Sequence, residues 1–171
     1  MMESITTVPN HTEILTYVHE KRGLLWEKIA DFCEEFKKAE GVLQHHTEAM
    51  IQSFPVKHHL ENGLYTREVF MPKGHLCVSF IHKQTHPGFF LSGEMSVLMD
   101  TGEIKRMKAP MKVITEIGTQ RIGYMHEDCV WVCVYRTDKE TIEEAEEEVY
   151  TLNYRELPEY VIINKKLLCQ E

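Results

Sequence analysis

The sequence predicts a mainly β protein, a sandwich or barrel of short strands that follows a helical N-terminal arm. Between residues 64 and 136, short apolar stretches alternate with turn residues at the regular spacing typical of such folds. Residues 12–39 instead carry apolar side chains at helical spacing. The chain has 171 residues, of which 43% are hydrophobic, so we expect one domain with its own core.

The N-terminal segment, residues 1–60, is expected to be a helical arm. Its apolar positions recur at spacings of three and four: Ile14, Val18, Leu25, Ile29, Phe32 and Phe36. This face suits packing on the β domain or against a second helix in a dimer, and both alternatives stay open. Two pairs of adjacent histidines follow, at 45–46 and 58–59. Neighbouring side chains on a strand point to opposite faces, so we expect surface or loop histidines rather than a chelate.

The central segment, residues 61–137, is expected to hold the strands. Turn residues such as Pro72-Lys73-Gly74, Pro87-Gly88 and Asp100-Thr101-Gly102 separate them, and the last of these predicts a tight hairpin. The strands are predicted at 64–70, 76–82, 89–91, 94–99, 103–108, 112–117, 121–126 and 129–136.

The C-terminal segment, residues 138–171, is expected to form an acidic helix and a tail. Helical texture returns at Thr141 to Val149, within a run that holds six glutamates. Farther on, the apolar stretch Tyr160-Val161-Ile162-Ile163 is predicted to add an edge strand or to exchange with a neighbouring subunit.

Charge and cysteine content exclude several classes of protein. The formal net charge is −8 and no basic stripe is present, which argues against a nucleic-acid partner. No apolar stretch approaches the length of a membrane span, and no secretion signal is visible, so we expect a cytoplasmic protein without a membrane partner. Five scattered cysteines argue against a disulfide framework. Cys129 and Cys133 share one face of a strand. We interpret them as small buried apolar residues, with zinc binding as the alternative.

Three histidines form the constellation that could carry chemistry. His82 and His86 are four apart on an extended segment and therefore face the same way. His126 comes from another strand. Neutral imidazoles on rigid strands suit iron, manganese, nickel or zinc, so we predict a possible divalent transition metal on these three residues. The alternative is a set of hydrogen-bonded core histidines.

Four further residues are predicted to shape a small-molecule pocket beside these histidines. Tyr124 lies two positions before His126, and its phenol could hydrogen-bond an oxygen of the ligand. Gln84 and the apolar Phe80 each lie two positions from His82, so on an extended strand they share its face. Arg121 could pair with an anionic ligand.

Two stretches of the chain resemble the conserved segments of the cupin superfamily. The first runs through Met71-Pro72-Lys73-Gly74, the two histidines of 82–86 and Leu91-Ser92-Gly93-Glu94; the second is 116–131. The second stretch also resembles small cupin-like proteins encoded in tailed-phage genomes. The resemblance covers about residues 64–137 and implies a cupin-like double-stranded β-helix, or jelly-roll barrel, in which histidines hold a metal.

The sequence departs from the cupin pattern in two places. Cupins commonly have two histidines one residue apart and a glutamate shortly after. Here three residues separate His82 from His86, and Phe90 stands where the glutamate would be. The missing carboxylate favours a small-molecule or metal-binding protein, and the resemblance to the phage proteins implies that it is phage-encoded and acts in the host cytoplasm. The alternatives are a mononuclear metal-dependent cupin enzyme (dioxygenase, isomerase or decarboxylase) and a structural oligomer. In each case we expect a homo-oligomer, at least a dimer.

Overall fold

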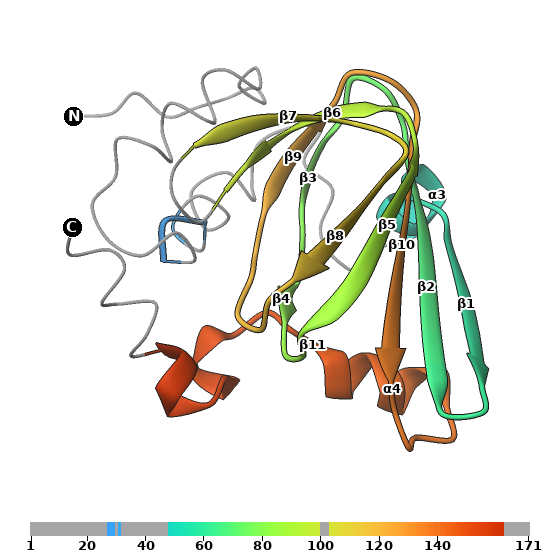
Figure 1. The fold of residues 1–171 in the computed structure, drawn as a ribbon, viewed down its shortest axis with the longest axis vertical. Helices are drawn as coiled ribbons and strands as arrows, with labels where there is room; N and C mark the ends of the chain where they lie inside the picture. The colour runs from blue at the N-terminus through green and yellow to red at the C-terminus, as the bar shows by residue number, and fades with distance from the viewer. Residues whose placement is uncertain (1–26, 30, 32–47, 100–102, 163–171) are drawn as a thin grey trace.

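The computed structural model describes residues 27–29, 31, 48–99 and 103–162, which form a mainly β structure with antiparallel sheets and few helices (Figure 1). One sheet contains, in spatial order, β1 (Val56–Glu61), β2 (Leu64–Met71), β10 (Cys129–Arg136), β5 (His86–Ser92) and β8 (Met111–Thr115). A second sheet contains β3 (Leu76–Val78), β9 (Ile122–Met125), β6 (Glu94–Leu98) and β7 (Ile104–Lys108). A short pair joins β4 (Ile81–His82) to β11 (Tyr150–Thr151).

The predicted mainly β fold is confirmed, and the strands follow the predicted stretches with two differences. The stretch 76–82 is divided, because β3 pairs with β9 whereas β4 leaves that sheet and pairs with β11. Strand β1 lies inside the segment assigned to the helical arm, and it places His58 and His59 in a sheet rather than in a loop. The turn from β1 to β2 holds Asn62 and Gly63 at positive φ, the conformation that an Asn-Gly hairpin favours.

Alternate residues on each strand point to the space between the two sheets. On the central strand β10 the inward side chains are Cys129, Trp131, Cys133 and Tyr135. One apolar cluster joins both sheets, and it contains Met71 and Phe90 from the first and Met95, Met107 and Met125 from the second. The core therefore lies between the two sheets, where any internal site must also lie.

Helix α4 (Ile142–Val149) confirms the predicted acidic helix. The hydroxyl of Thr141 caps it by accepting a hydrogen bond from the backbone N–H of Glu144. Its buried residues Ala145 and Val149 pack in one cluster with Tyr65 and Tyr135 of the first sheet. The helix thus lies across the end of the sheet at which β2 begins and β10 ends (Figure 1).

The tail differs from its prediction. A 3-10 turn, η1 (Tyr154–Glu156), is followed by a helical stretch at 159–162, so the strand predicted at 160–163 is wrong over its described part. Pro158 accepts the backbone hydrogen bond of Val161 through its carbonyl, and Val161 then buries itself with Leu157 against Ile81. Helix α3 (Glu48–Ser53) precedes the first strand, and within the described residues no helix has the length and apolar character of a membrane span.

Two predictions fall mostly outside the described residues. Of the helix expected at 12–39, residues 27–29 and 31 are described; they are helical, and Ile29 is buried. The hairpin turn at 100–102 is not described, but the strands that flank it pair as expected, with Leu98 opposite Ile104.

Candidate functional site

The space between the sheets has an apolar end and a polar end. At the apolar end lie the methionines and Phe90 of the core cluster. At the other end, beside α4, Tyr65, Tyr135 and Tyr150 are buried together with His82 and His86. Such a gradient brings hydrogen-bonding groups to one end of an otherwise apolar interior, as in many small-molecule sites.

A cavity of about 130 Å³ lies between the two ends. Its walls are largely apolar and include methionines from both sheets, Phe80, Val97 and Trp131. The polar or charged residues that line it are Arg67, Ser79, His82, Arg121 and Tyr150. Among the described residues, no aspartate or glutamate lines the cavity, so its fixed charge is positive.

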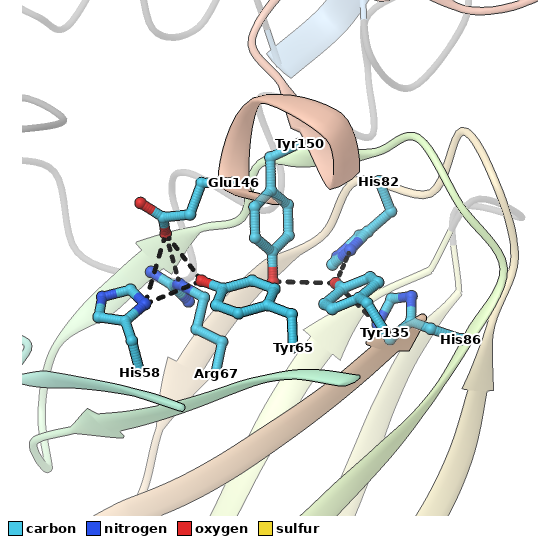
Figure 2. Close-up of polar contacts among 8 residues, drawn as sticks. All are labelled: His58, Tyr65, Arg67, His82, His86, Tyr135, Glu146 and Tyr150. Carbon is cyan, nitrogen blue, oxygen red and sulfur yellow. Dashed lines mark hydrogen bonds and ion pairs between the residues drawn. The ribbon is translucent and has the colours of Figure 1, made fainter. Parts of the chain in front are cut away.

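The Tyr135 hydroxyl is the centre of a buried network beside the cavity (Figure 2). It lies 2.9 Å from Nδ1 of His82, 3.1 Å from Nε2 of His86 and 2.9 Å from the hydroxyl of Tyr150. The two histidine rings are 4.7 Å apart between centroids, with neither bonded directly to the other. His86 also contacts the backbone carbonyl of Gln84 through Nδ1, at 3.1 Å.

A second group of contacts ties α4 to the first sheet (Figure 2). The carboxylate of Glu146 accepts a hydrogen bond from the Tyr65 hydroxyl at 3.2 Å and lies 3.4 Å from Nε of Arg67. This Nε is buried and makes no hydrogen bond of good geometry, so the contact with Glu146 is an ion pair without an aligned N–H. The Arg67 guanidinium also lies over the rings of Phe80 and Tyr150.

Burial sets the protonation states of this region. It lowers the pKa of His82 well below its ordinary value, and the nearby His86, Arg121 and Arg67 lower it further. Burial likewise lowers the pKa of His86. Both imidazoles are therefore neutral near pH 7. The pKa of Tyr135 is raised by burial, so its hydroxyl keeps its proton.

The structure brings some of the predicted site residues together. Phe80, His82 and Arg121 all line the cavity, and His86 is connected to His82 through Tyr135. Arg121 also donates a hydrogen bond to the Thr115 hydroxyl at 3.2 Å. Gln84 contributes its backbone carbonyl to His86 and is not among the residues that line the cavity.

His126 and Tyr124 lie elsewhere. Nε2 of His126 is 2.7 Å from the hydroxyl of Ser96, and the Tyr124 ring packs edge-on against the imidazole. These three residues alternate with the core residues Met95 and Met125, so they occupy the opposite face of the second sheet. The structure therefore does not assemble the predicted three-histidine metal site.

The described residues do not fit a metal ion. They contain no group of three or more His, Cys, Asp or Glu side chains placed to hold one. His82 and His86 both direct a nitrogen to the Tyr135 hydroxyl, and no carboxylate completes the set. Cys129 and Cys133 are buried free cysteines whose pKa burial raises, so near pH 7 they are thiols rather than metal-binding thiolates.

Several residues of this region were not predicted as functional: Arg67, Tyr135, Glu146 and Tyr150. A signal existed for Tyr135, because it alternates with Trp131 and Cys133 on one face of a strand. Tyr150 and Glu146 reach the site from the segment after the sheet, and no local pattern indicates such a contact.

This chain is similar in fold to solved structures that include cupin domains. No family model matches the chain, and no curated protein matches it. An ectoine synthase from P. lautus is 13% identical, with 63% of this chain and 86% of that chain covered and a TM-score of 0.46. A cupin 2 domain-containing protein from Halorhodospira halophila is 12% identical, covering 60% and 72%, with a TM-score of 0.44. The Cupin_2 domain of an XRE family transcriptional regulator from Enterobacter cloacae is 14% identical, covering 52% and 100%, with a TM-score of 0.42. At such identities and TM-scores, the comparison assigns this chain neither a family nor an activity.

Proposed function

We propose that this chain is a binding protein whose ligand is a small organic anion with an apolar body, held in the cavity between the two sheets. The observation that carries this proposal is the composition of the cavity wall, in which two arginines face an otherwise largely apolar space without a lining carboxylate in the described residues. Arg67 pairs with Glu146, and Arg121 lies near the neutral His82 and donates to the Thr115 hydroxyl. An anion placed here gains a charge-assisted contact in surroundings of low dielectric.

The size of the cavity limits the ligand. A dry protein cavity of roughly 150 Å³ accommodates benzene. The cavity of about 130 Å³ therefore suits a body of similar size. A carboxylate and one further small substituent on such a body would bring the ligand to about ten non-hydrogen atoms. Benzoate is a suitable probe because it combines an apolar ring with one anionic group.

The proposal is tested by titrating the protein with benzoate and with nitrobenzene, a neutral molecule of nearly the same shape. We expect benzoate to bind at least about 10-fold more tightly, since a hydrogen bond to a charged group contributes about 1.5–3 kcal/mol. Arg121→Met should remove most of that preference, and Arg121→Lys should retain part of it. Arg106→Met is the matched control, because Arg106 is exposed and pairs with Glu94 on the surface.

A second variant tests whether the ligand binds in this cavity. A Cβ at Gly123 would meet its nearest atoms, Met95 Sδ and the Ser96 carbonyl, at 4.0 Å, so the strand tolerates a side chain there. Gly123→Val would project methyl groups into the cavity that Gly123 lines, and we expect it to abolish benzoate binding while the protein stays folded. Equal affinity for benzoate and nitrobenzene, or unchanged binding in Gly123→Val, would overturn the proposal.

The metal-dependent cupin enzyme predicted as an alternative depended on a centre made of three histidines. With His126 on the other face of the second sheet, the described residues give that alternative no support. The predicted dimer and the resemblance to phage-encoded proteins stay predictions.

A further inference from the structure

His82 lines the cavity and has one ring nitrogen hydrogen-bonded to Tyr135, whereas the other makes no hydrogen bond within the described residues. Its side chain lines the cavity and is 7% exposed. Nδ1 lies 2.9 Å from the Tyr135 hydroxyl, whereas Nε2 makes no hydrogen bond within the described residues. Nε2 is not one of the buried side-chain atoms without a partner in the described part of the chain, so solvent reaches it, and a ligand in the cavity can replace that solvent as its hydrogen-bond partner.

Counting protons shows what His82 Nε2 offers. The Gln84 carbonyl can only accept, so neutral His86 carries its proton on Nδ1 and presents a lone pair at Nε2. The Tyr135 hydroxyl donates its single proton to the Tyr150 hydroxyl, so the Tyr135 oxygen is the acceptor in its contact with His82 Nδ1–H. A neutral His82 protonated at Nδ1 has a lone pair at Nε2. That nitrogen is a hydrogen-bond acceptor.

The other polar side chains that line the cavity are hydrogen-bond donors only or are already hydrogen-bonded within the protein. Arg67 and Arg121 are donors only. The Ser79 hydroxyl donates to the Phe80 carbonyl and accepts from the backbone N–H of Arg121, and the Tyr150 hydroxyl is bonded to Tyr135. The cavity wall therefore combines cationic donors, which call for an anionic acceptor on the ligand, with one imidazole acceptor, which calls for a donor.

We propose that His82 Nε2 accepts a hydrogen bond from a hydroxyl group of the ligand, so that the ligand class is a small hydroxylated carboxylic acid rather than a plain one. This inference rests on the proposed function, because it assumes that the anion occupies the same cavity. A site that hydrogen-bonds a ligand hydroxyl rejects the analogue that lacks it, since the buried acceptor is then left unpaired. Because Tyr135 donates to the Tyr150 hydroxyl and accepts from His82, these two tyrosines are the positioning residues that hold His82 in the required tautomer.

The test compares the three hydroxybenzoates with benzoate and with the three methylbenzoates, in which a methyl group replaces the hydroxyl at similar size. We expect one hydroxybenzoate isomer to bind at least about 10-fold more tightly than both benzoate and its own methyl analogue. His82→Asn keeps a donor near the position of Nδ1 and deletes Nε2. It should remove the preference for the hydroxyl, so that the preferred hydroxybenzoate and its methyl analogue bind with equal affinity.

A measurement on the unmodified protein covers the case in which His82→Asn does not fold. Nitrogen-15 NMR should show His82 Nε2 as an unprotonated nitrogen whose signal shifts when the preferred hydroxybenzoate binds and stays in place with the methyl analogue. If benzoate and the methylbenzoates bind as tightly as every hydroxybenzoate, the inference about His82 is overturned and the anion site stands. If none of these carboxylates binds, the proposed function itself is overturned.

Discussion

Gly88 on β5 lies directly against the indole of Trp131 on the neighbouring strand β10. A Cβ at position 88 would be 2.9 Å from two atoms of that ring, closer than real Cβ contacts allow. The glycine lets the indole lie flat over β5, where it stacks on Phe90 and forms part of the cavity wall. We therefore predict that Gly88→Ala lowers the free energy of unfolding by about 1–3 kcal/mol through overpacking. Urea denaturation followed by tryptophan fluorescence measures this.

Gly123→Ala is the control for this substitution. It adds the same methyl group to a strand of the second sheet, where the nearest atoms are 4.0 Å away. Its free energy of unfolding should stay within about 0.5 kcal/mol of the original value or rise slightly. Equal losses in the two variants would show that the indole moves aside at little cost.

Removing the Tyr135 hydroxyl should affect stability more than its size implies. In Tyr135→Phe, His82 Nδ1, His86 Nε2 and the Tyr150 hydroxyl all lose a partner in a buried region. Leaving buried polar groups unpaired costs about 1–3 kcal/mol, so we expect a loss of about 2–3 kcal/mol in the free energy of unfolding. Tyr160→Phe, at a side chain that is 61% exposed, should change it little. A Tyr135→Phe variant as stable as the original would mean that water replaces the hydroxyl.

The sequence of strands along the chain and the residues that share a strand face could be predicted from local patterns because period-two alternation is a property of each strand alone. The same rule placed Phe80 and His82 on one face, and both line the cavity. It failed for His126, where alternation shows which residues share a face and not which face is inward. The buried neighbours Met95 and Met125 take the inward positions instead.

The rest of the site depends on contacts between distant segments, which local patterns do not contain. Tyr150 reaches Tyr135 only because α4 lies across the end of the sheet and β11 pairs with β4. Strand β1 was not predicted, because its two adjacent histidines interrupt the apolar alternation. The Asn62-Gly63 pair that follows is nevertheless a strong hairpin signal in the sequence.

Glu146 should be the most sensitive glutamate of α4. It is the counter-charge of Arg67 and the acceptor for Tyr65, so Glu146→Ala leaves a largely buried guanidinium without its ion-pair partner. Breaking a fully buried pair costs about 3–5 kcal/mol. Because the Glu146 side chain is 33% exposed, we expect a smaller loss of about 1–3 kcal/mol in chemical denaturation.

Glu147→Ala makes the same change one position along the helix, at an exposed side chain. Helix propensity and net charge change equally in the two variants, so the difference between them reports the contacts of Glu146 with Arg67, Tyr65 and His58. Indistinguishable stabilities would indicate that solvent screens Arg67 without help from Glu146.

Acidification should destabilise the protein through its buried histidines. Burial lowers the pKa of His82 and His86 below the ordinary value of 6.5, so below about pH 6.5 the unfolded chain binds protons that the folded chain excludes. Stability rises with pH wherever the unfolded state holds more protons. This contribution is therefore complete above pH 6.5 and decreases as the pH falls toward the folded-state values. Each such histidine adds up to about 1.4 kcal/mol per pH unit to the slope.

Denaturation midpoints measured from pH 7 to 5.5 should show a shallower slope in His82→Asn than in the original protein, even though the variant is less stable at pH 7. Gly123→Ala, which changes no titratable group, should keep the original slope. Parallel slopes for the original protein and His82→Asn would mean that His82 is protonated as readily in the folded chain as in the unfolded one, which its burial against Tyr135 argues against.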